Sequence, residues 1–149
     1  TLEAQGERFD YLVLLEPTSP LTEASDVDGA LERLVARRDI ADALVSVNEL
    51  TGSHPAFAVR QRSDGRLEPY AAVDFTRLPR RQDVDPIYAL DGSLYISSVA
   101  AYRKTLSFCH DRTLSYVMPH YKSLEVDSLI DFICIEAILK NYEQIRCAA

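Results

Sequence analysis

The sequence predicts an α/β fold in which helices flank a mainly parallel sheet. A strand-like apolar segment, an amphipathic helical pattern and a second strand-like segment follow one another within about forty residues, which is the order of a right-handed βαβ unit. Both strand-like segments are apolar without alternation, as expected for strands covered on two faces. The 149 residues, 47% of them hydrophobic, suffice for one packed core. We therefore predict a single domain over residues 1–149.

The first half of the chain carries the βαβ pattern. The first strand is expected at residues 9–16, FDYLVLLE. Pro17 and Pro20 in the following PTSPL exclude both helix and strand. A helix is then expected with Ser25 as its N-cap and Asp28 as the capping-box partner. The second strand is expected at residues 41–49. The apolar face of the helix comprises Val27, Ala30, Leu31, Leu34 and Val35.

The second half begins with a predicted hairpin. Residues 56–61 and 66–70 flank the turn sequence Ser63-Asp64-Gly65. Further strands are expected at residues 92–98 and 114–118, with a short helix after the first of them. A closing helix is expected over residues 127–142. Its apolar positions are Leu129, Ile130, Ile133, Cys134, Ala137 and Ile138.

Composition and charge exclude several classes of function. The net charge of -7 argues against a nucleic-acid surface, because phosphate chains require concentrated Lys and Arg. The longest apolar run is too short to span a bilayer, and no secretory leader opens the sequence. The three cysteines lack metal-type spacing, so we expect reduced thiols in a cytoplasmic protein.

Five stretches, in order, resemble the acylneuraminate cytidylyltransferase family. They are LLEPTSPL (14–21), PRRQ (79–82), LDGSLYI (90–96), YVMP (116–119) and LEVDSLIDF (124–132). The resemblance covers nearly the whole chain and implies a partial Rossmann-like nucleotidyltransferase fold. It also implies that residues 54–82, with their hairpin, are a dimerisation insertion. The family's N-terminal segment around the CTP phosphates has no counterpart here, so we expect the chain to be the C-terminal portion of such a protein.

The resemblance implies a nucleotidyltransferase that is active with Mg²⁺. The reaction is transfer of CMP from CTP to the anomeric hydroxyl of a sialic-acid-like nine-carbon ulosonic acid, with release of pyrophosphate. Its partners are CTP, the acidic sugar and a second copy of the chain in a homodimer, with no nucleic acid and no membrane. The product serves lipopolysaccharide, capsule or glycan biosynthesis. A divalent ion held by oxygen ligands suits such a transfer.

The resemblance assigns metal and catalytic roles to a few residues. Glu125 and Asp127 are the candidate metal ligands, and Asp127 and Arg81 are the candidate catalytic residues. The family has Asp at both ligand positions, so Glu125 is a departure. Carboxylates two residues apart in an extended turn point to the same side. The alternative is that Asp127 caps the last helix and Glu125 is only solvated.

A further set of residues is expected to bind the substrates. The guanidinium of Arg81 has the geometry to bind a carboxylate or a phosphate; the alternative is that Arg81 is only a surface charge. Asp91 replaces a family Asn and can only accept hydrogen bonds when ionised; its alternative is a turn residue. Glu16 replaces a family Gln near the cytidine. The full set comprises Glu16, Thr18, Ser19, Arg81, Gln82, Asp91 and Gly92.

Two other functions stay open from the sequence. At Glu16, Asp91 and Glu125 the chain departs from the residue that the family has at the matched position, and the phosphate-binding segment is lacking. Both observations favour a non-catalytic fragment or remnant that acts as an interaction module. The other alternative is a related sugar nucleotidyltransferase of different specificity. We expect the isolated chain to have negligible synthetase activity.

Overall fold

The computed structural model describes residues 2–71 and 73–148 and divides into two compact units. The first unit comprises the residues up to Asn48 together with those from Leu90 onward, and the second is Glu49–Ala89. The predicted dimerisation segment, residues 54–82, falls inside the second unit.

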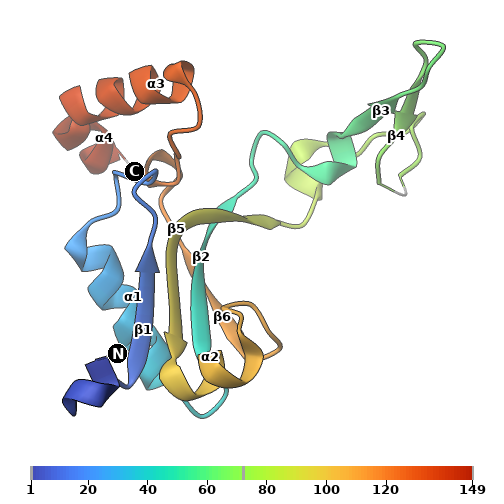
Figure 1. Cartoon of the computed structure of the whole chain (residues 1–149). Coiled ribbons are helices and arrows are strands. Elements are labelled where there is room, and N and C mark those ends of the chain that lie inside the picture. Colours follow the sequence, from blue (N-terminus) through green and yellow to red (C-terminus); the bar gives the residue numbers. More distant parts are fainter. Residues whose placement is uncertain (1, 72, 149) are drawn as a thin grey trace. The chain divides into compact units, whose positions relative to one another are not determined.

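The first unit is built on a four-stranded sheet with the strand order β1-β5-β2-β6 (Figure 1). The strands are β1 (Tyr11–Leu15), β2 (Ala43–Glu49), β5 (Tyr88–Ser98) and β6 (Thr113–Val117). All four were expected from the sequence, within a few residues at their ends. Together with the helices, they confirm the predicted α/β class.

The expectation of a mainly parallel sheet is wrong. Strands β2 and β6 are parallel, with Ala43 opposite Thr113, but β1 and β5 are antiparallel. The backbone N–H of Ser98 also donates to the carbonyl of Asp42, so the end of β5 lies at the start of β2. The reason is the connection: the chain leaves β2, passes through residues 49–89 and enters β5 without a helical crossover, which parallel neighbours require. The Rossmann-like description of the fold stays a prediction.

Within the described residues, four α-helices accompany the sheet: α1 (Ala24–Ala36), α2 (Val99–Thr105), α3 (Leu129–Lys140) and α4 (Tyr142–Ala148). The predicted N-cap of α1 is wrong, because the cap is Glu23 and its capping-box partner is Asp26 rather than Asp28. The carboxylate of Asp26 accepts from the backbone N–H of Glu23 at 2.8 Å. Both acidic side chains also bind Lys122, a contact across the fold that the local spacing does not contain.

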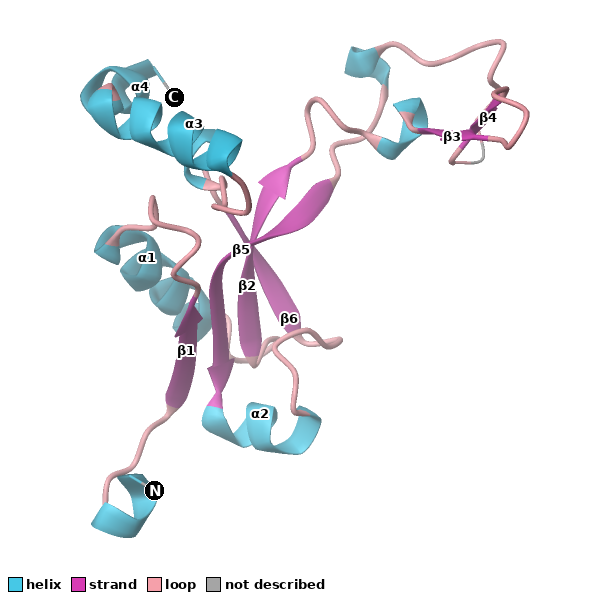
Figure 2. Ribbon diagram, turned by 45° about the horizontal axis from the view of Figure 1, so that its top comes forward, coloured by secondary structure: helices cyan, strands magenta, loops and turns pink. Residues whose placement is uncertain are grey.

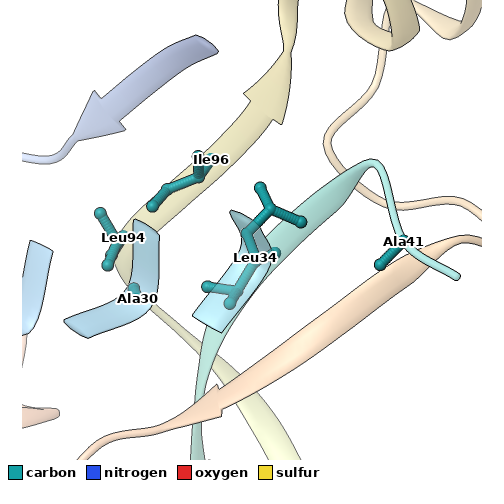
Figure 3. Packing of buried hydrophobic residues seen from close by; sticks show 6 residues of the cluster. Ala30, Leu34, Ala41, Leu94 and Ile96 are labelled. Atoms are coloured by element: carbon teal, nitrogen blue, oxygen red, sulfur yellow. The ribbon is translucent and has the colours of Figure 1, made fainter. Parts of the chain in front are cut away.

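The core lies between α1 and the sheet, as Figure 3 shows for its central side chains. Ala30 and Leu34 of α1 pack against Leu44 of β2 and Leu94 and Ile96 of β5, and all five are fully buried. Most of the predicted apolar face of α1 thus points into the core, with Val35 an exception at 41% exposure.

Two apolar surfaces of the first unit are exposed. Strand β1 was expected to be covered on both faces, but it is an edge strand, and Leu12, Val13, Leu14 and Leu15 are 37–50% exposed. Helix α3 is apolar nearly all round, yet only Ile135 is buried among its described residues. Soluble monomers seldom leave such continuous apolar surface in water.

The second unit contains the expected hairpin, β3 (Val59–Gln61) paired antiparallel with β4 (Leu67–Pro69) (Figure 2). Gly65 in the connecting turn has φ of +82°, a conformation that favours glycine. Residues 56–58 were expected in the first strand of the hairpin, but a 3₁₀ turn at Pro55–Phe57 precedes it instead. A proline at the first position and the His54 ring as a cap favour that turn over a strand.

Across residues 2–71 and 73–148, the structure has no helix with the length and apolar character needed to cross a membrane. The three cysteines, Cys109, Cys134 and Cys147, are free thiols, as the sequence predicts.

Candidate active site

Two loops of the first unit meet at the ends of the strands β1 and β6. The PTSPL loop follows β1, and the turn with Glu125 and Asp127 lies between β6 and α3. The backbone N–H of Val126 donates to the carbonyl of Thr18 at 2.8 Å and joins the loops. Ser19 closes a turn by donating its N–H to the carbonyl of Glu16 at 3.1 Å. The predicted Thr18 thus contributes its backbone to the site.

A pocket of about 470 Å³ opens beside the PTSPL loop. Ser19 and Thr22 line it, and their buried hydroxyl oxygens have no hydrogen-bond partner among the described residues. Buried hydroxyls are usually paired, so these two groups can serve a bound molecule. The pocket is completed by Leu15, Glu16, Pro17, Pro20, Glu23, Ala24, Val27 and Asp28.

The absence of a side chain at Gly92 of β5 leaves room for the Glu125 carboxylate. Gly92 has φ of +72°, and a Cβ added there would lie 1.7 Å from Oε1 of Glu125. The carboxylate therefore occupies the space that any other side chain at position 92 would fill. Gly92 serves the site through this close approach to Glu125.

Asp91 is a buried strand residue, 4% exposed, so the alternative of a turn residue is wrong. Its Oδ1 atom accepts hydrogen bonds from the hydroxyl of Ser46 and, at 3.1 Å, from the backbone N–H of Ser93. Its Oδ2 atom is buried without a partner among the described residues. An unpaired buried carboxylate oxygen is costly, and a bound cation or donor would relieve that cost.

Carboxylates surround Glu125 and change its titration. Burial raises the pKa of Glu125 above its usual value, and the charges of Glu16, Asp127 and Asp91 raise it further. The buried Ser19 hydroxyl acts weakly in the opposite direction, although it is outside hydrogen-bonding geometry. The structure therefore brings together four of the acidic residues that the sequence singled out. Their mutual repulsion favours a cation at this place.

Asp127 does not cap α3, the helix that follows the turn with Glu125. The N-cap of α3 is Ser128, whose hydroxyl accepts from the backbone N–H of Asp131 at 3.4 Å. The carboxylate of Asp131 in turn accepts a hydrogen bond from the N–H of Ser128 at 2.8 Å. The alternative reading of Asp127 as a cap is wrong, and its exposed carboxylate is available to a ligand. Glu125 is partly buried rather than only solvated, so that alternative is also wrong.

The donor set suits Mg²⁺ bound together with a substrate. In the described part of the chain, no group of three or more His, Cys, Asp or Glu side chains is arranged to hold a metal by itself. Mg²⁺ commonly uses one or two carboxylates and takes its other ligands from water and substrate phosphates. Glu125 and Asp127 match that pattern in number and in chemistry.

Arg81 and Gln82 lie in the second unit, where they line a pocket of about 570 Å³ with His54, Phe57 and Tyr88 among others. Arg81 is exposed and has no hydrogen bond or ion pair with another described residue. The neighbouring Arg80, in contrast, binds Asp83 at 2.8 Å. The guanidinium of Arg81 is thus available for an anion at this pocket.

His54 is held in one tautomer at the same pocket. Its Nδ1 atom accepts from the backbone N–H of Ala56 at 3.0 Å, so the proton resides on Nε2. Nε2 donates to the carbonyl of Asp85 at 3.1 Å. Both ring nitrogens are therefore engaged in shaping the pocket wall.

Lys122, Ser46 and Tyr95 belong to the site region but were not predicted as site residues. Lys122 binds Glu23 and Asp26 across the fold, and Ser46 binds Asp91. Burial raises the pKa of Tyr95, with further contributions from Glu16 and Glu125. Each of these interactions joins residues 30 or more positions apart in the sequence, so no local motif predicts it.

Comparison with known proteins supports the resemblance that the motifs indicate. The chain is 34% identical over 121 residues to a Streptococcus agalactiae protein named N-acylneuraminate cytidylyltransferase, a match that covers 81% of the chain and 28% of that relative. An Escherichia coli protein of the same name is 25% identical over 124 residues, which are 83% of the chain and 28% of the relative. A Legionella pneumophila protein named CMP-N,N'-diacetyllegionaminic acid synthase is 27% identical over 134 residues, 89% of the chain and 55% of the relative. No family model matches the chain.

These similarities confirm the predicted resemblance: 81% of the chain is similar to proteins named N-acylneuraminate cytidylyltransferase. It spans little more than a quarter of the length of the streptococcal and Escherichia coli relatives and about half of the Legionella relative. The five motifs that carry the resemblance include the two loops that meet at Glu125.

Proposed function

We propose that these residues form part of a cytidylyltransferase active site, which transfers CMP from CTP to a sialic-acid-like nine-carbon sugar. The observation that carries the proposal is the turn with Glu125 and Asp127, held against Gly92 and the PTSPL loop among further carboxylates. The names of the similar proteins support the same reaction class.

The reaction joins the anomeric oxygen of the sugar to the α-phosphorus of CTP. The bond between that phosphorus and the oxygen bridging to the β-phosphate breaks, pyrophosphate leaves, and the sugar hydroxyl gives up its proton. Catalysis of such transfers depends on positioning and on neutralising charge. Mg²⁺ held by Glu125 and Asp127 would supply that neutralisation when bound. The clustered carboxylates favour such a cation, since burial and then the charges of Glu16, Asp127 and Asp91 raise the pKa of Glu125.

The chain's own polar groups are proposed to bind the two substrates. Ser19 has a buried hydroxyl without a partner in the described structure, beside the pocket at the PTSPL loop. We assign this hydroxyl and the Glu16 carboxylate to the nucleotide side. Arg81 and Gln82 line the pocket of the second unit, and the guanidinium there suits the carboxylate of an acidic sugar.

We also propose a homodimer that uses the second unit. A two-stranded hairpin is marginally stable by itself, and this unit exposes large apolar side chains at Val59, Leu67, Tyr70, Phe75, Leu78 and Tyr88. Sedimentation equilibrium of the chain and of a Leu67→Asp variant tests this. The proposal expects a dimer that the variant weakens, and a strict monomer at micromolar concentration contradicts it.

The proposed location is the cytoplasm, where CTP is available. The three free cysteines agree with a reducing compartment, because secreted domains commonly oxidise theirs. Fractionation of cells that express the protein, with a periplasmic and a cytoplasmic marker, tests the location directly.

The activity is tested by pyrophosphate release on the longest natural protein that contains this chain. The assay combines CTP, Mg²⁺ and a panel of nine-carbon ulosonic acids. Asp127→Asn removes one charge from the carboxylate turn and should abolish turnover. The matched control is Asp131→Asn, four residues further along the chain, where an amide oxygen can still accept the capping hydrogen bond. It should retain activity within about threefold.

Three outcomes would count against the proposal. Equal turnover of the Asp127 and Asp131 variants would remove the metal role from Asp127. A folded protein that releases no pyrophosphate with any of the sugars would favour the non-catalytic interaction module instead. Activity restricted to another nucleotide or sugar class would identify a related nucleotidyltransferase.

A further inference from the structure

Lys122 is a buried lysine that binds two acidic residues at the start of α1. It is 5% exposed, and its Nζ atom lies 2.6 Å from Oε2 of Glu23 and 2.8 Å from Oδ2 of Asp26. Burial by itself would lower the pKa of Lys122, but the hydrogen bonds with Asp26 and Glu23 outweigh it and raise that pKa. Lys122 is therefore charged at neutral pH, and its charge is fully paired within the fold.

The position of Lys122 in the chain connects this ion cluster to the carboxylate turn. It ends the 3₁₀ turn at His120–Lys122, three residues before Glu125. The next residue, Ser123, accepts a hydrogen bond from Asn48 at the end of β2, at 3.1 Å. Val126 then donates to the carbonyl of Thr18. Glu125 thus lies on a short segment held at residues 122, 123 and 126.

Of the three attachments at residues 122, 123 and 126, the one at Lys122 is the only one that involves charged groups, and it is also the most buried. Ser123 and Val126 each make a neutral hydrogen bond, whereas Lys122 makes charge-assisted bonds to two carboxylates, which are about twice as strong. Asp26 is also fixed by the capping box of α1. The ion cluster therefore anchors the segment to a rigid helix start that itself packs on the core.

We propose that Lys122 is a positioning residue, which sets the carboxylate turn of Glu125 and Asp127 for cation binding without touching the cation or the substrates. The inference rests on the proposed function, since it assumes that this turn binds a divalent cation. Outer partners that orient metal ligands commonly alter metal affinity by about ten- to a hundredfold. Because the Lys122 charge is already paired with Glu23 and Asp26, its effect on the turn is one of position.

The variant that tests this must avoid an unpaired buried charge. Lys122→Met alone leaves the buried carboxylate of Asp26 without its cation, which can unfold the chain. The double variant Lys122→Met with Asp26→Asn keeps the net charge and leaves an amide oxygen to accept from the N–H of Glu23. It removes the cross-fold attachment while the helix cap is preserved.

A matched control exists at the opposite end of β6. Arg112 binds Asp42 at 2.6 Å, and these residues directly precede β6 and β2. The double variant Arg112→Met with Asp42→Asn also removes one ion pair that joins distant segments, again without a change in net charge. It lies away from the carboxylate turn, so it controls for a general loss of stability.

Two readouts are measured on the purified chain and on both double variants. One is Mn²⁺ binding, followed by the paramagnetic signal of free Mn²⁺. The other is hydrogen exchange of the Val126 amide, which reports the turn independently of any metal. For the Lys122 variant we expect Mn²⁺ affinity to fall by about tenfold or more and Val126 to lose protection, while the Leu94 amide in the core stays protected. The Arg112 variant should change neither readout at the turn.

The outcomes separate this inference from the proposed function. If the wild-type chain binds Mn²⁺ and the Lys122 double variant binds it equally well, with the Val126 amide still protected, the positioning role is overturned. Equal losses in the Lys122 and Arg112 variants overturn it as well, since they indicate only a general loss of stability. If the wild-type chain binds no Mn²⁺, the metal role of the turn fails, and the exchange of Val126 then decides alone whether Lys122 holds the turn. If Lys122→Arg keeps the Mn²⁺ affinity and the Val126 protection that the Lys122 double variant loses, the result would support an anchoring charge at position 122.

Discussion

Replacing Gly92 with alanine is expected to displace the Glu125 carboxylate. The added Cβ would lie 1.7 Å from Oε1 and 2.8 Å from the carboxyl carbon, whereas real Cβ contacts essentially never fall below 3.0 Å. The Oε1 atom must therefore move by at least 1.3 Å, the difference between 3.0 Å and 1.7 Å. A long side chain can do this by rotation, so most of the cost in stability comes from the backbone. At φ of +72° alanine costs about 1–2 kcal/mol relative to glycine.

The assay pairs urea unfolding with Mn²⁺ binding on the same protein. We expect the free energy of unfolding to fall by about 1–2 kcal/mol and the Mn²⁺ affinity to fall by about tenfold. The second effect follows because metal sites tolerate displacements of only about 0.5 Å in their ligands. Both measurements are made at the same pH.

Gly65→Ala is the matched control for backbone strain. Gly65 has φ of +82°, but a Cβ there would meet nothing within 4 Å. This variant should be strained to a similar extent and should bind Mn²⁺ as the wild type does. Gly92→Ala should also have no further effect on affinity when Glu125 is already alanine. A folded Gly92→Ala chain with wild-type Mn²⁺ affinity would refute the reasoning.

Three further predictions concern the core and the carboxylates. Leu34→Ala should lower the free energy of unfolding by about 2–5 kcal/mol in urea, because Leu34 is fully buried in the core; a loss below about 1 kcal/mol would contradict the packing in Figure 3. Asp91→Asn should leave stability unchanged or raise it and should lower the pKa of Glu125 in an NMR titration, since it removes a buried charge with an unpaired oxygen. Burial and the nearby carboxylates raise the pKa of Glu125 in the folded state, so that state holds this proton more tightly than the unfolded chain. The contribution of Glu125 to the stability of the metal-free chain should therefore be lost as pH rises from about 4.5 through its raised pKa. Urea unfolding from pH 4 to pH 8 should show this loss as a difference between the wild type and Glu125→Gln.

The local elements were predictable because their signals lie in neighbouring residues. The apolar run before Pro17 predicted β1, and the helical spacing of Ala30 and Leu34 predicted the buried face of α1. The hairpin around Gly65 followed from its turn residues. Element ends were less certain: the cap of α1 is Glu23 with Asp26 as its capping-box partner, and Lys122 from a distant segment binds both carboxylates.

Much of the candidate site was predicted from motifs, but its interactions were not. Glu16, Ser19, Asp91, Glu125 and Asp127 were singled out in the sequence, and the structure brings them together in the first unit. The sequence did not predict that Asp91 is buried against Ser46. It also did not predict that Glu125 lies over Gly92. These contacts depend on the register of β5, which the intervening residues 49–89 do not reveal.

The sequence by itself determined the α/β class, the strand and helix segments and the resemblance to the cytidylyltransferases, because periodicity, turn residues and ordered motifs are local properties. The tertiary structure decided the direction of β5, the exposure of β1 and the burial of Lys122. It also decided that Ser128, rather than Asp127, caps α3. Strand direction and burial depend on which segments distant in the chain pack together, and that information is spread over the whole sequence rather than carried by any one motif.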